Sequence, residues 1–327
     1  MLLGYAIRRV LWVVPIMLGA SAVAFTIMHA APGSPWNREG RQLNPEVVER
    51  LTEELGLDQP LPIQYLRWLS HMFQGDFGVG TDTTRYQVSD AVAQAIGPTL
   101  FLCVSAFLLA VAVGLPLGLV AALRNRTPTG YAATGVALLG MALPAFALAG
   151  FFEVVFPPEF RPPPGPFNPP PGPFGLDRPL LEWVLPIVAL AGLPMAQIAR
   201  HTKGSVLEVL HSDYVRTAHS KGLRGNHIVR IHLLRNAAIP IVTIAGSILA
   251  LLITGSVVVE RVFEIPGLGN LYYFAIRGRD YTLLMAITVI YAGVVAVANA
   301  VVDITYGVID PRIRDGSRAA LEPGTGG

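Results

Sequence analysis

Charged side chains are scarce in this chain. Asp, Glu, Lys and Arg make up 14% of its 327 residues, whereas soluble domains carry about 25%. The charges that are present cluster, and long apolar stretches separate them. A net charge of +2 gives little attraction for nucleic acid, which we do not expect as a partner. The composition therefore indicates a protein that crosses a membrane several times.

Several signatures of catalysis and metal binding are also missing. Cys103 is the one cysteine, so no disulfide can form within the chain, and we interpret it as a buried structural residue. The sequence contains no GxxxxGKS/T phosphate loop, no HExxH and no GxSxG. We therefore expect a protein that is not an enzyme, with no catalytic residue, cofactor or metal in this chain.

Ionisable groups are nearly absent from the apolar stretches. Glu153 and Asp303 lie at the ends of such stretches rather than in the middle. Transporters driven by protons or ions usually place carboxylates or histidines deep in the membrane. A secondary transporter or channel is thus the less favoured interpretation, and the energy for any transport should come from a partner.

Six windows without Asp, Glu, Lys or Arg predict six membrane-spanning helices, since a span needs about 20 apolar residues. Pro186 and Pro194 predict a kink or tilt in the fourth. The first window could also be a signal peptide, because Arg8 and Arg9 precede it, but the five spans that follow favour an uncleaved anchor. The trimmed spans are residues 10–30, 99–123, 131–155, 183–201, 239–260 and 283–306.

The basic residues orient these spans. Apart from the long segment 31–98, most of them fall on the side that holds the N-terminus, the loop after the fourth span and the tail. The positive-inside rule places that side, and hence both termini, in the cytoplasm. The predicted fold is all-α and polytopic. It comprises 1–30 as N-terminus and first span, 31–98 as an extracytoplasmic helical segment, 99–310 as the transmembrane core with a loop at 201–238, and 311–327 as a cytoplasmic tail.

Two outer segments have a pattern of their own. An amphipathic stretch from Ile63 to Phe73 predicts a helix within segment 31–98. That segment is either a small cap on the membrane surface or a docking surface for an extracytoplasmic partner. Residues 157–173 are rich in proline and predict a stiff, extended connection between the third and fourth spans.

The loop at 201–238 predicts two short helices, Tyr214–Ser220 and Asn226–Asn236, separated by a break at Gly222. Such a compact projection could transmit force by fitting a groove on a soluble motor. The alternative is a basic loop that lies on anionic lipid.

The sequence of this loop, DYVRTAHSKGLRGNHIVRIHLLRNAAIPIVT from Asp213 to Thr243, resembles the coupling loop of inner-membrane permeases in ABC importers of dipeptides, oligopeptides and nickel. Arg216, Thr217 and Ala218 stand at the EAA positions of the general motif EAA-x3-G, and Gly222 stands at its glycine. The likeness extends to RRVLWVVPIMLGAS, LGLDQPLPIQYLRWLSHMFQGDFG, VERVFEIPGLGNLYYFAIRGRDY and DITYGVIDPRIR.

The resemblance implies a type I ABC importer permease fold, and the long outer segment suggests the B-type of two paired permeases. It implies a C-type permease partner, two ATP-binding subunits that hold ATP and Mg, an extracytoplasmic substrate-binding protein and membrane lipid. The implied function is ATP-driven import of di- or oligopeptides across the plasma membrane of a prokaryote. Nickel or other metal chelates, glutathione and oligosaccharides stay open as cargo.

Two groups of site residues follow. The ATPase-coupling group is implied by the resemblance and consists of Asp213, Tyr214, Arg216, Thr217, Ala218, Lys221 and Gly222. The second group forms a turn on the outer side, which is either a gate near the binding-protein interface or an ordinary re-entrant turn fixed by proline and glycine. Its members are Pro266, Gly267, Gly269 and Asp280.

Overall fold

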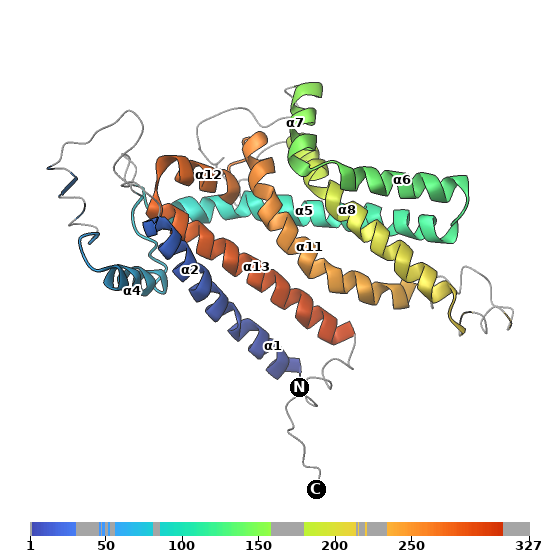
Figure 1. Cartoon of the computed structure of the whole chain (residues 1–327), viewed down its shortest axis with the longest axis horizontal. Helices are drawn as coiled ribbons and strands as arrows, with labels where there is room; N and C mark the ends of the chain where they lie inside the picture. The colour runs from blue at the N-terminus through green and yellow to red at the C-terminus, as the bar shows by residue number, and fades with distance from the viewer. Residues whose placement is uncertain are drawn as a thin grey trace, which may run out of the picture.

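The structure of the protein is a computed structural model, which describes residues 2–30, 46, 48–49, 52, 56–80, 86–157, 180–213, 215, 220 and 234–309. These residues form long helices, with one isolated β-bridge between Val79 and Gln87 (Figure 1). The helices are α1 (Leu2–Leu11), α2 (Val13–Ala30), α4 (Leu61–Met72), α5 (Val88–Leu123), α6 (Pro128–Ala142), α7 (Ala145–Val155), α8 (Leu180–Leu210), α11 (Leu234–Val262), α12 (Leu268–Gly278) and α13 (Tyr281–Ile309).

Four helical segments among the described residues are long and apolar enough to cross a membrane, and a bent helix pair raises the number to five. The four are Ala6–Ala30, Val88–Leu123, Leu181–Leu210 and Tyr281–Ile304. The helix α11 covers the predicted fifth span but is not among them. The chain is therefore mostly helical, with four to five candidate spans in its described part.

The predicted third span is not one straight helix. It divides into α6 and α7, whose axes differ by 94°. The break falls at Leu143 and Pro144, where both residues have extended backbone angles. Proline lacks the amide hydrogen needed inside a helix, so it stands before the first turn of α7 instead of within a continuous span. In the fourth span, by contrast, Pro186 and Pro194 both lie inside α8.

The helices α5 and α8 form the centre of the bundle. Gly114 and Gly118, a GxxxG pair, let the two backbones approach closely. A Cβ on Gly114 would lie 2.7 Å from the carbonyl oxygen of Met195, and one on Gly118 would collide with the carbonyl of Ala199. Cys103 is buried in the same core, as predicted.

The helices α2 and α13 lie side by side along one edge of the bundle (Figure 1). At the predicted cytoplasmic side, Arg9 of α1, the helix before α2, forms an ion pair of 3.1 Å with Asp303 of α13. At the other end α4 lies against α2, where the hydroxyls of Tyr65 and Ser21 are 2.9 Å apart. The predicted helix in segment 31–98 is thus confirmed, and it packs on the first span.

Candidate functional site

The turn that contains Pro266, Gly267 and Gly269 joins α11 to α12, and all three residues are buried. The carboxylate of Glu260, in the last turn of α11, reaches into this turn. Its Oε2 accepts hydrogen bonds from the amides of Gly269 at 2.7 Å and Asn270 at 3.3 Å. Glu260 has no exposed surface. A buried carboxylate is costly unless it has hydrogen-bond partners, and the two amides of the turn are those partners. The bonds therefore define the conformation of the turn.

Thr99 of α5 completes the arrangement. Its hydroxyl donates to Glu260 Oε1 at 2.9 Å and accepts from the Leu268 amide at 2.8 Å. The first three amides of α12, which have no partner inside the helix, are therefore all satisfied by Glu260 and Thr99. A negative charge at a helix N-terminus is also favoured by the helix dipole. Three helices, α5, α11 and α12, meet at this one point.

The turn needs glycines because there is no room for a side chain at these positions. A Cβ on Gly267 would lie 2.6 Å from Thr99 Oγ1 and would also collide with the Glu260 carboxylate. A Cβ on Gly269 would collide with the backbone of Val257. Gly267 has a φ of −103°, which any residue can adopt. The close approach of α12 to α11, rather than an unusual backbone angle, therefore selects glycine here.

Asp280 lies at the opposite end of α12, so the predicted outer group is divided between the two ends of this helix. Asp280 is 3% exposed and accepts hydrogen bonds from the Tyr86 hydroxyl at 2.9 Å and the Leu283 amide at 3.1 Å. Its own amide donates to the Ala275 carbonyl at 2.9 Å. The carboxylate of Asp280 thus caps the start of α13, and its backbone amide bonds to the end of α12.

Sequence reasoning missed Glu260, Thr99 and Tyr86. Glu260 carried a detectable signal, because it is an acidic residue at the end of an otherwise uncharged span. Thr99 and Tyr86 carried none, since their partners lie 161 and 194 residues away in the sequence.

The coupling group falls almost wholly outside the described residues. Asp213 is described and is exposed, three residues after the end of α8. The other members lie outside the described part of the chain: Tyr214, Arg216, Thr217, Ala218, Lys221 and Gly222. Within the described part, no group of three or more His, Cys, Asp or Glu side chains is placed to hold a metal ion.

This helical bundle can be compared with known proteins. Residues 114–315 match the family model of the binding-protein-dependent transport system inner membrane component, and residues 2–88 match the N-terminal model of the same systems. The chain belongs to this family. It is thus a permease component of an inner membrane.

Relatives match along nearly the whole chain. The oligopeptide transport system permease protein AppB of Bacillus subtilis is 36% identical over 316 residues, which cover 95% of this chain and 99% of that protein. The permease protein OppB of the oligopeptide system of Salmonella typhimurium is 36% identical over 314 residues, covering 96% and 100%.

Among solved structures, a chain of the MetNI methionine ABC transporter in an inward-facing conformation superposes with a TM-score of 0.54. The superposition covers 67% of this permease and 96% of that chain, at 18% identity. At that identity the likeness shows the fold alone, which is that of an ABC importer permease.

Proposed function

We propose that this permease is the B-type transmembrane subunit of an ATP-driven importer of di- or oligopeptides. The observation that carries the proposal is the similarity to oligopeptide permeases from end to end, including the outer segment before α5. A C-type permease is its partner in the membrane, an extracytoplasmic binding protein delivers the peptide, and two separate ATP-binding subunits hydrolyse ATP.

The proposed topology has six spans with both termini in the cytoplasm. The bent pair α6 and α7 forms the third span, and α11 forms the fifth. The distribution of basic residues supports this orientation. Segment 31–98 and α12 then lie on the outer side, and the coupling group lies on the cytoplasmic side, where an ATP-binding subunit receives it.

The helix α12 is the rigid part of the proposed outer gate. It is fastened at its first turn by Glu260 and Thr99 and at its end by Asp280. Glu260 belongs to α11 and Thr99 to α5, while Asp280 directly precedes α13. Nucleotide-driven movement of the long helices therefore moves α12 with them, so that closure at the cytoplasmic side changes access at the outer side.

The test is uptake by the purified transporter in liposomes, with the binding protein outside and ATP inside. We expect accumulation of a radiolabelled peptide that requires ATP, together with ATPase activity that the binding protein stimulates. Accumulation of nickel chelates or oligosaccharides without peptide would assign a different cargo to the same machinery. Failure of any P-loop ATPase to co-purify with this permease would overturn the proposal.

A further inference from the structure

The helix α4 packs beside a candidate membrane span. Its Tyr65 hydroxyl contacts Ser21, which precedes the end of α2 by nine residues, or about 14 Å along the helix axis. His29 Nε2 and Gln64 Oε1 are 3.3 Å apart closer to the end of α2. Because residues 6–30 form a candidate membrane span, a helix packed against this part of α2 extends into the adjacent leaflet.

Each face of α4 fits such a position. Tyr65 and Met72 face the protein. Ile63, Leu66 and Phe73, at helical spacing, expose 49%, 62% and 64% of their surface to the surroundings. A helix with one apolar face of this kind lies in the boundary between lipid headgroups and acyl chains. The exposed apolar face of α4 suits contact with acyl chains better than contact with water.

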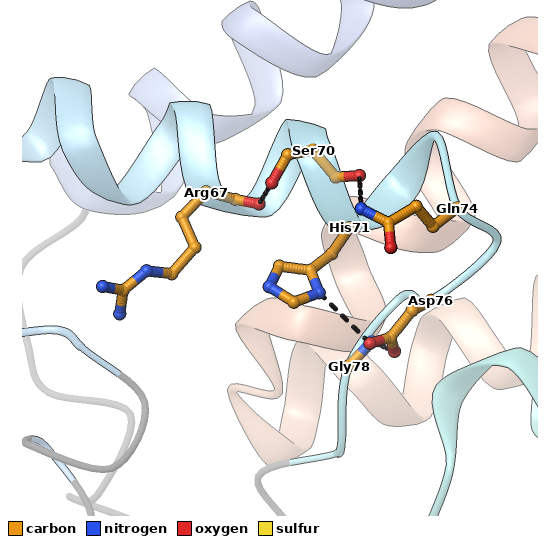
Figure 2. A network of polar contacts seen from close by, with 6 residues as sticks. All are labelled: Arg67, Ser70, His71, Gln74, Asp76 and Gly78. Carbon is orange, nitrogen blue, oxygen red and sulfur yellow. Dashed lines mark hydrogen bonds and ion pairs between the residues drawn. The ribbon is translucent and has the colours of Figure 1, made fainter.

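The third face of α4 carries Arg67 and His71 and lines a cavity of about 470 Å³ between α2, α4 and the start of α13, whose wall is otherwise mostly apolar. Arg67 and His71 project from the same side of the helix, one turn apart (Figure 2). His71 lies 3.3 Å from Asp76, whose other oxygen accepts from the Gly78 amide at 2.8 Å. The Asp76 carboxylate beside the cavity therefore already has two partners, His71 and the Gly78 amide.

Arg67 makes no ion pair with any residue that the structure describes, so its positive charge is available at the cavity. Trp68 also lines the cavity, but its indole Nε1 has almost no exposed surface and does not face the cavity. His29 lines the wall as well, and its ring nitrogens already lie 2.9 Å from the Phe25 carbonyl oxygen and 3.3 Å from Gln64 Oε1. The guanidinium of Arg67 is complementary to a phosphate group.

A second cavity, of about 400 Å³, adjoins the first at Phe25 and His29, which line both. It is mostly apolar and runs between α2 and the first turn of α4, as far along α2 as Ala22. A cavity with Arg67 in its wall and an apolar groove therefore meet beside α2. An amphiphile fits both.

We propose that these adjoining cavities bind one anionic phospholipid, with its phosphate headgroup at Arg67 and an acyl chain in the groove along α2. The bound lipid seals α4 to the first span and fixes the outer segment at the membrane surface. The proposal requires only that the chain resides in a membrane and does not depend on the transported cargo.

The test is native mass spectrometry of the detergent-purified transporter after addition of phosphatidylglycerol or phosphatidylcholine. We expect the wild type to retain phosphatidylglycerol in preference. Arg67→Gln should retain about tenfold less, because one charge-assisted contact is lost, while Arg67→Lys retains most of it. Arg277→Gln is the matched control, since Arg277 is exposed on α12 and does not line the cavities.

The groove is tested separately. Ala22→Phe should fill it and lower phosphatidylglycerol retention, whereas Val23→Phe, at an exposed neighbour outside the cavities, should not. Glycerol phosphate, a headgroup without chains, should fail to displace the lipid. Equal retention of both lipids, equal losses in Arg67→Gln and Arg277→Gln, or full displacement by glycerol phosphate would each overturn the proposal.

Discussion

The hydroxyl of Thr99 lies 2.9 Å from the carboxylate of Glu260, although 161 residues separate them in the sequence. Through this contact α5 holds the last turn of α11, and the same two side chains hold the first turn of α12. The strength of the proposed gate can therefore be tested with single substitutions.

Removal of the Glu260 carboxylate should loosen α12. Glu260→Ala leaves the Gly269 and Asn270 amides buried without partners, at a cost of about 1–3 kcal/mol each. We expect a lower melting temperature of the purified transporter and reduced peptide uptake at equal expression. Glu153→Gln, which changes an exposed carboxylate, is the control. A Glu260→Ala protein that melts like the wild type would contradict the role given to this residue.

Substitution of Gly269 should strongly destabilise the protein, even when the added group is as small as a methyl. The added methyl group of Gly269→Ala meets the Val257 backbone, which cannot move aside as a side chain can. Overpacking of this kind costs about 1–3 kcal/mol, and we expect a corresponding loss of thermal stability. Gly135→Ala provides the comparison, because a Cβ there meets nothing within 4 Å. Similar melting curves for the two variants would show that the turn has room to adjust.

Tyr86→Phe removes the donor to Asp280 and leaves the rest of the ring in place. A hydrogen bond to a charged group contributes about 1.5–3 kcal/mol. The expected result is faster hydrogen exchange at the start of α13 and the end of α12, with little change elsewhere. Tyr131→Phe, at a tyrosine that is 67% exposed, should leave exchange unaltered.

The predicted coupling loop is tested by Gly222→Glu. A side chain at this position opposes the left-handed conformation expected after the first loop helix. Uptake should be abolished while the protein still inserts in the membrane. Gly204→Glu, at an exposed position in α8 where a Cβ has free space, should keep uptake. Wild-type uptake by Gly222→Glu would refute the assignment.

The long helices were predictable because an uncharged apolar window about as long as a bilayer is thick admits few other structures. The spacing of Gly114 and Gly118 permits close contact with another helix, but it does not identify α8 as the partner. The bend at Pro144 had a local signal that hydropathy alone obscures. The cap of α12 by Glu260 and Thr99 could not be predicted, since it depends on how three helices meet after folding.

The length of α5 has a mechanical consequence. Its 36 residues make a rod of about 54 Å, which exceeds the hydrocarbon thickness of about 30 Å even at the largest usual tilt of about 40°. Part of α5 therefore projects from the bilayer. For a rod of this length, a change in tilt of about 5° displaces one end by about 5 Å relative to the other. A small change in the tilt of α5 at one face of the membrane thus moves its other end by several ångströms at the opposite face.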